Sequence, residues 1–239
     1  MFRKVIGMRP FCLILFLIAS LPLYAQRRVS ADVTVKMIGN GNATNMTKSV
    51  YCSSDGRMIS VSNTKDGRIF VLTNIQGETS IYNENRKEVA MDNRGLMLST
   101  DELLQIFLLR RATDMGMGAY GYQLTKTTRE EQYIKKVFEP KKQNSNCSRV
   151  EIVFDEFKPI YCAYFDHKGK IITKVYYSQY ALQDRFMFPT RVTEITYANA
   201  KDSIVKLDLY TNIQVDQDDP MFDFQVPVDA KVIKMNGKK

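Results

Sequence analysis

The sequence is poor in the side chains that most enzymes use for acid–base or metal chemistry. It has no tryptophan and a single histidine, His167, within the polar stretch Asp166-His167-Lys168-Gly169. Such a stretch is typical of a solvent-exposed turn between strands, and we favour an exposed turn residue over a general base. The Gly-x-Ser-x-Gly motif of serine hydrolases is also missing. We therefore expect that the protein is not an enzyme.

Cysteine is scarce as well. Of the four cysteines, Cys12 lies in an apolar N-terminal run, and Cys52, Cys147 and Cys162 follow it. None has the spacing of a zinc site, and three cysteines in an oxidising compartment permit one disulfide with one thiol left over. The sequence leaves the pairing open. An acidic stretch at 216–219 lacks the spacing of a calcium-binding EF-hand, so we expect no metal and no cofactor.

Long apolar runs are missing after the first residues. Phe11 to Leu23 is almost uninterrupted and follows the basic residues Arg3, Lys4 and Arg9, with the small Ala25 just before Gln26. This run is shorter than the roughly 20 residues that span a bilayer as a helix. We interpret residues 1–25 as a cleaved signal peptide and 26–239 as a single exported domain, not membrane-spanning after cleavage. An uncleaved anchor is the alternative interpretation.

Positive charge is in excess but is not gathered into a stripe. The formal net charge is +8, carried in separate pairs such as Arg27-Arg28, Lys135-Lys136 and Lys141-Lys142. A nucleic-acid-binding surface usually combines clustered basic residues with stacking aromatics, so we expect no nucleic-acid partner. Solvated surface is the favoured interpretation, and weak attraction to anionic lipid headgroups is the other.

What the sequence does contain is mostly strand pattern. Val33, Val35 and Met37 alternate with polar residues, as expected for a half-buried strand. Turn signals such as Asp55-Gly56 and Asp66-Gly67 recur about every ten residues, a spacing typical of antiparallel hairpins. We predict a mainly β chain with one or two helices, in which an antiparallel meander curls into a sandwich or a barrel.

One stretch predicts a helix. Ser99 and Glu102 have capping-box spacing, and the following residues to Arg111 are apolar around most of the helix. The next stretch, Ala112 to Ala119, contains Gly116 and Gly118, which we interpret as a hinge because glycine loosens the backbone. The insert 99–118 would therefore be a mobile helical element needing a second apolar partner besides the sheet.

A curled sheet with an apolar concave face and an apolar helix could enclose an acyl chain, because each buried methylene contributes about 0.8 kcal/mol. The alternative is a solid core with no ligand. The candidate walls of a hydrophobic ligand-binding cavity are Phe70, Leu72, Ile81, Leu103, Leu104, Ile106, Phe107, Met115 and Met117.

Two stretches and the order of elements carry a resemblance to a known family. The tail Asn212 to Pro227 contains an acidic turn and Phe222-Asp223-Phe224, with Val232-Ile233 after it. The segment Gly77 to Asn83 ends an aromatic strand in Tyr82-Asn83. Hairpins, then one apolar helical insert, then hairpins complete the pattern. The sequence resembles the LolA-like family of periplasmic lipoprotein carriers, as a divergent member.

The resemblance implies a half-open β-barrel whose helical lid falls on residues 99–118. It also implies a periplasmic carrier or chaperone that binds acyl chains of lipoproteins or lipids for transfer to the outer membrane. Transfer proteins of the inner and outer membranes would be its partners. A periplasmic sensor or interaction module of the same fold, without transport activity, is the alternative.

The sequence departs from the family pattern at two places. The family usually begins with an amphipathic helix, whereas here only Gln26 to Ser30 precede the first strand. The family's Arg-Pro pair after the second strand, which helps to latch the lid, is replaced by Cys52-Ser53-Ser54-Asp55-Gly56, with Arg57 displaced. A latch of the carrier type is therefore not expected.

Overall fold

A computed structural model describes residues 27–39, 41–74, 78–92, 103–142, 146–197 and 202–233. The predicted signal peptide and the capping-box residues Ser99 and Glu102 lie outside the described residues, as does Gly77. Among the helices of the described chain, none is long and apolar enough to cross a membrane.

The chain is built almost wholly of strands. Among the described residues, they precede and follow one short α-helix, α2, and a one-turn 3₁₀ helix, η2, lies near the C-terminus. In chain order the elements are β1 (Arg28–Gly39), β2 (Asn42–Ser53), β3 (Met58–Thr64), β4 (Gly67–Thr73), β5 (Thr79–Asn83), β6 (Glu88–Asp92), α2 (Leu103–Leu108), β7 (Tyr122–Glu130), β8 (Tyr133–Pro140), β9 (Arg149–Asp155), β10 (Lys158–Phe165), β11 (Ile171–Gln183), β12 (Phe186–Tyr197), β13 (Ser203–Val215), η2 (Pro220–Asp223) and β14 (Lys231–Ile233).

The strands that the structure describes form one 14-stranded sheet in the order β14-β6-β5-β4-β3-β2-β1-β13-β12-β11-β10-β9-β8-β7. Neighbouring strands are antiparallel except β14, which pairs in parallel with β6. The pairing of β1 with β13 joins two hairpin meanders, with Val33 opposite Tyr210 and Val35 opposite Asp208. β14 and β7 form the two edges, so the sheet is not closed.

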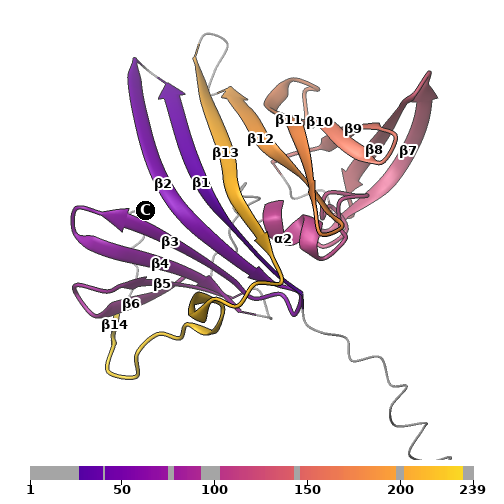
Figure 1. The fold of residues 1–239 in the computed structure, drawn as a ribbon. Coiled ribbons are helices and arrows are strands. Elements are labelled where there is room, and N and C mark those ends of the chain that lie inside the picture. The colour runs from indigo at the N-terminus through magenta and orange to yellow at the C-terminus, as the bar shows by residue number, and fades with distance from the viewer. Residues whose placement is uncertain are drawn as a thin grey trace, which may run out of the picture.

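The sheet curls around the helix. In Figure 1 the strands sweep in a wide arc, and α2 lies inside it, between the central strands and the β7–β9 end. Side chains from β3 on one side of the centre and β8 on the other belong to the same apolar cluster as α2. The prediction of a mainly β, curled, half-open antiparallel sheet with a helix inside it is confirmed, apart from the parallel β14–β6 pair.

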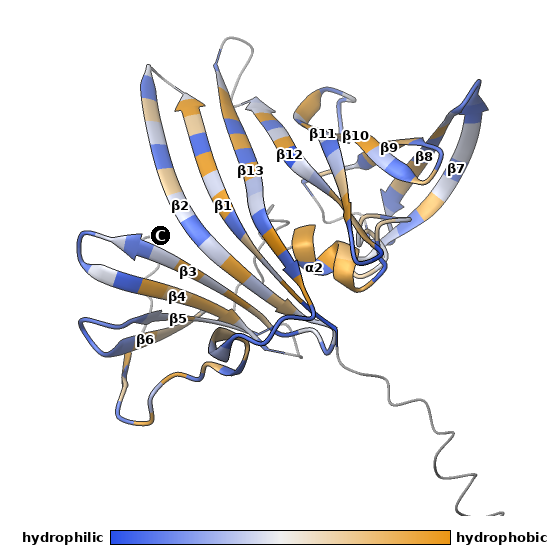
Figure 2. Cartoon of the chain, in the orientation of Figure 1, coloured by the Kyte–Doolittle hydropathy of each residue, from blue (hydrophilic) through white to orange (hydrophobic). Residues whose placement is uncertain are grey.

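The two faces of the sheet have different covers, because successive side chains of a strand point to opposite faces. On β1, Val29, Val33 and Val35 are buried on the side that α2 packs against, whereas Asp32 is exposed on the other. We call the first the helix face and the opposite one the tail face. Figure 2 shows α2 as strongly apolar and the long central strands as alternating between apolar and polar residues.

The C-terminal segment, residues 216–233, covers part of the tail face. Asp219 caps η2, since its side chain accepts a hydrogen bond from the Met221 amide at 2.8 Å. Phe222 meets Tyr51 edge-to-face, and the ring of Phe224 stacks on Phe70 with centroids 4.3 Å apart. The two phenylalanines of the Phe-x-Phe motif therefore pack the C-terminal segment against the sheet.

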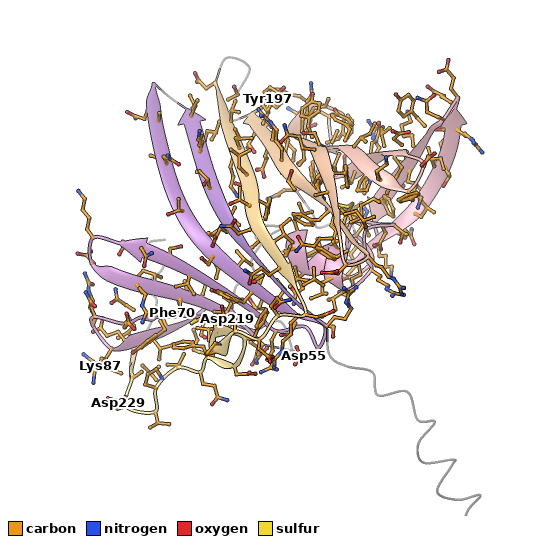
Figure 3. The ribbon with its side chains drawn as sticks, in the orientation of Figure 1. Asp55, Phe70, Lys87, Tyr197, Asp219 and Asp229 are labelled. Atoms are coloured by element: carbon orange, nitrogen blue, oxygen red, sulfur yellow. The ribbon has the colours of Figure 1, made fainter. Side chains whose placement is uncertain are left out.

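Further along the same segment, the Lys87 ammonium lies 3.1 Å from the Asp229 carboxylate (Figure 3). This ion pair is exposed at both ends, so it contributes little to stability. The apolar contacts of Phe222 and Phe224, together with the pairing of β14 with β6, attach the segment to the sheet.

The helix is shorter than predicted. Its described turns end at Leu108 rather than at Arg111, because Arg110 has a left-handed φ of 56°. The Arg111 amide donates to the Ile106 carbonyl and the Arg110 amide to the Phe107 carbonyl, at 2.8 and 3.0 Å. These two bonds form a Schellman motif, which normally uses glycine at the left-handed position. An arginine there gives no sequence signal for the helix end.

Replacing Phe70 should test how much the tail contributes. Phe70 is 0% exposed and stacks on Phe224, so Phe70→Ala should lower the free energy of unfolding by about 3–5 kcal/mol through lost burial and a residual cavity. Urea denaturation followed by circular dichroism measures this change. A loss under about 1 kcal/mol would show that the tail does not pack on β4 in solution.

Candidate functional site

Six of the predicted wall residues do gather at one end of the helix face. Leu103, Leu104, Met115 and Met117 are buried in the cluster that lines this face, and Ile106 is buried beside them. Phe107 is half-buried, with its ring 5.2 Å from the ring of Phe188 on β12 and 6.5 Å from that of Tyr180 on β11. Phe107 is thus the aromatic side chain through which α2 meets the β11–β12 side of the sheet.

The structure does not bring the remaining wall residues to this place. Register places Ile81 opposite Val71, Val71 opposite Ser60 and Ser60 opposite Val50, so Ile81 faces the helix side but on the outlying strand β5. Phe70 and Leu72 point to the tail face, where the ring of Phe70 stacks on that of Phe224. The physical reason is that β4 is apolar on both faces, so periodicity could not choose between them.

α2 is held over the sheet by packing and by one side-chain hydrogen bond. It packs on β1, β2 and β12. The Gln105 side-chain amide donates to the Gly56 carbonyl in the turn between β2 and β3. This turn is the place that corresponds to the family's Arg-Pro pair, which the sequence lacks, and here an amide–carbonyl bond ties the helix to the sheet. No sequence pattern pointed to Gln105.

The predicted hinge is a compact run of turns. The Asp114 carboxylate accepts hydrogen bonds from the amides of Gly116 and Gly118, at 3.0 and 3.1 Å. Gly116 has φ of 77°, and a Cβ there would approach the Tyr120 ring at 3.3 Å, which explains why glycine occupies the position. Whether Gly116 and Gly118 act as a hinge stays a prediction.

Charged side chains also lie on the helix face, and the sequence did not predict them. Asp208 on β13 is buried and pairs in register with Val35 of β1 and Val192 of β12, both core residues of this face. The Lys206 ammonium is 3.3 Å from the Asp208 carboxylate. In the sequence, Val205, Leu207 and Leu209 resemble the buried set, whereas register places them on the tail face. Only the pairing of β13 with β1 reveals the true arrangement.

Buried thiol and phenol groups complete the helix face between β10 and β11. Burial raises the pKa of the Cys162 thiol to about 12, and burial raises the pKa values of Tyr164 and Tyr177 well above their ordinary range. Burial also raises the pKa of Tyr180, whose hydroxyl donates to the Pro159 carbonyl. These groups stay neutral near pH 7, so this part of the face presents uncharged surface. Among the described residues, Cys52, Cys147 and Cys162 are not joined to one another by a disulfide.

A polar cavity of about 460 Å³ lies near the start of β1 and the end of β13. Within it, the Asp32 carboxylate accepts from the Ser49 hydroxyl at 2.7 Å and from the Asn212 side-chain amide at 2.8 Å. Burial, and then the charges of Asp219 and Asp32, raise the pKa of Tyr51 at its wall. Both Asp32 oxygens already have donors, so this cavity offers a satisfied polar network rather than a vacant acceptor.

Other site chemistries find no support in the part of the chain that the structure covers. No group of three or more His, Cys, Asp or Glu side chains in it could hold a metal ion. His167 lies exposed in the turn between β10 and β11, as predicted from its neighbours in sequence.

Comparison with known proteins supports the fold but gives no sequence relative. No protein-family model matches the sequence, and no curated protein matches it. The structure is similar to a LolA superfamily protein from Nitrosomonas europaea, with a TM-score of 0.59 and 11% identity over 84% of this chain and 92% of that one.

Two further solved structures are similar. A domain named as an outer membrane lipoprotein-sorting protein, from Vibrio parahaemolyticus, has a TM-score of 0.56 and 10% identity over 82% of this chain and 89% of that one. A DUF1329 family protein from Desulfovibrio piger has a TM-score of 0.50 and 14% identity over 87% and 94%. The chain therefore has a LolA-like fold, at sequence identities that show the fold alone.

Thiol labelling should report whether the helix face is closed. Since the pKa of Cys162 is raised from 9.0 to about 12, its thiolate fraction at pH 8 falls roughly 1000-fold, and labelling should be at least about 100-fold slower than in the urea-unfolded chain. The same shift stabilises the folded state below about pH 9, and this contribution is lost as the pH rises toward 12. Site-resolved mass spectrometry after iodoacetamide treatment measures the rate. Equal rates in folded and unfolded protein would show that β10 is open to solvent.

Proposed function

We propose that this chain of LolA-like fold is an exported carrier or chaperone that acts in the periplasm. It binds acyl chains of lipoproteins or lipids on the helix face and passes them toward the outer membrane. Transfer proteins of the inner and outer membranes would deliver and accept the cargo.

The observation that carries this proposal is the combination of an apolar helix face with an unclosed sheet. Buried apolar side chains from β1, β2, β9 and β12 line this face around α2. The sheet ends in two separate edges, β14 and β7, so the face is reached without breaking a closed ring of strands. Apolar surface on the inside of an open sheet favours a ligand of apolar chemistry.

The placement of α2 fits a cover over such a ligand. Its apolar side chains pack on the helix face, and the Gln105 side chain donates a hydrogen bond to the Gly56 carbonyl of the sheet. Phe107 is only half-buried between Tyr180 and Phe188, so its ring can exchange aromatic contacts for contacts with an acyl chain. The name of the similar structure from Vibrio parahaemolyticus, an outer membrane lipoprotein-sorting protein domain, supports the same function.

Binding rather than catalysis is proposed because no histidine among the described residues lies on the helix face. The chain's only histidine, His167, is exposed in a turn. The titratable side chains Tyr164, Tyr177 and Cys162 on the helix face are held neutral by burial, which suits contact with an apolar chain.

A periplasmic sensor or interaction module without transport activity is the second candidate. The observation that favours it is the edge strand β7, most of whose side chains are exposed, including Leu124 at 52%. An unpaired edge can accept a strand from another protein. Cross-linking at β7 that captures a protein partner, with no lipid in the purified protein, would favour this candidate over the carrier.

Replacing Phe107 tests the carrier function. Phe107→Ala removes about 60 Å² of apolar contact, worth roughly 1.5 kcal/mol, and should weaken binding of a fluorescent fatty-acid probe about tenfold. Because the ring is half-buried, the free energy of unfolding should fall by less than about 2 kcal/mol. Fluorescence titration and urea denaturation measure the two quantities.

Phe70→Ala is the matched control, since the same substitution is made on the tail face. It should cost more stability and leave probe affinity of the folded protein within about twofold of wild type. A wild-type protein that binds no probe would refute the carrier function. In the opposite case, Phe107→Ala would lower the free energy of unfolding as much as Phe70→Ala does and leave probe affinity unchanged. That result would show that the helix face is a filled core.

A further inference from the structure

The helix face changes character along β13. Tyr210 packs against Phe188, which in turn contacts Phe107 of α2, with ring centroids 4.8 and 5.2 Å apart. Asp208 follows two residues away on the same face, which places it about 7 Å further along the strand. The face therefore places a buried charged group a short distance from the aromatic side chains that contact α2, an arrangement that suits an amphiphile.

One carboxylate oxygen of Asp208 accepts no hydrogen bond from the described part of the chain. Its side chain is 2% exposed, and one carboxylate oxygen, Oδ2, lies 3.3 Å from the Lys206 ammonium. The other oxygen, Oδ1, is buried and has no hydrogen-bond partner among the residues that the structure describes. A buried carboxylate oxygen without a donor is costly, so such groups in native proteins need an explanation.

Within the described chain, Asp32, unlike Asp208, has a hydrogen-bond donor at each carboxylate oxygen. Asp32 lies in the polar cavity, where Ser49 and Asn212 supply donors to both of its oxygens. The chain thus completes the hydrogen bonding of an exposed carboxylate and leaves that of a buried one incomplete. A ligand that donates a hydrogen bond at Asp208 would remove the deficit.

We infer that Asp208 binds the ammonium group of an amphiphile whose acyl chain lies against α2, Phe188 and the neighbouring apolar residues. This inference rests on the proposed carrier function and names its ligand class. Lys206 offsets the charge at one carboxylate oxygen, and an N–H donor at the other forms a charge-assisted hydrogen bond in a site shielded from water. An aminophospholipid headgroup and the free amino terminus of a lipoprotein share this chemistry.

Two lysophospholipids with the same acyl chain test the inference on the full chain. Lysophosphatidylethanolamine carries an ammonium with N–H donors, whereas lysophosphatidylcholine carries a trimethylammonium without them. Competition against the fluorescent fatty-acid probe should show about tenfold tighter binding of the ethanolamine lipid, the size of effect expected for one hydrogen bond to a charged group.

Asp208→Asn should reduce this preference to about twofold or less while both lipids still bind. Glu194→Gln is the matched control, because Glu194 lies opposite Lys206 on β12 and its carboxylate already accepts from the Thr196 hydroxyl at 3.1 Å. That variant should keep the preference. If Asp208→Asn does not fold, the comparison of the two lipids on the wild-type protein still decides.

The possible outcomes distinguish failure of the role of Asp208 from failure of the proposed carrier function. Binding of neither lipid would refute the carrier function itself. Equal binding of both by the wild-type protein, or an equal loss of preference in both variants, would overturn the role of Asp208 and leave acyl binding standing. A diacylated lipopeptide with a free amine, compared with its trimethylated form, identifies the source: a preference there, beyond that for the phospholipid, indicates lipoprotein as the cargo.

Discussion

The pairing of β1 with β13 is the interaction on which the rest of the structure depends. It joins the meander of β2 to β6 to the meander of β7 to β12, and without it each would end in an additional open edge. Its register also decides which side chains share a face, since Val33 lies opposite Tyr210 and Val35 opposite Asp208. The apolar surface around α2 and the charged group beyond it both follow from this one ladder.

The two faces of the curled sheet are completed in different ways. On the tail face the chain supplies its own cover, with Phe224 stacked on Phe70 and Phe222 against Tyr51. On the helix face the cover among the described residues is a six-residue helix whose last turn ends at an arginine in a left-handed conformation. A fixed cover on one side and a short helical one on the other is the physical basis for placing cargo on the helix face.

Local patterns in the sequence predicted the elements but not their partners. Alternation on β1, the turn signals and the apolar stretch around Leu104 correctly indicated a curled β meander with one helix, and the Phe-x-Phe tail supported the LolA-like fold. The four residues Ile69 to Leu72 are all apolar, so no periodicity could tell that Phe70 faces the tail. On β13 alternation alone does not show that Leu207 and Leu209 lie on the tail face, because the choice depends on pairing between strands far apart in the sequence.

Photo-crosslinking of the full chain with a fatty acid that carries a photoreactive group near its methyl end distinguishes the two faces most directly. Peptide mapping should place the cross-links on α2 and on residues 186–192 and 150–165 of the helix face. Saturating unlabelled fatty acid, added before irradiation, should prevent these cross-links from forming. Cross-links confined to residues 216–233 and to β4, or none that unlabelled fatty acid removes, would contradict binding of acyl chains on the helix face.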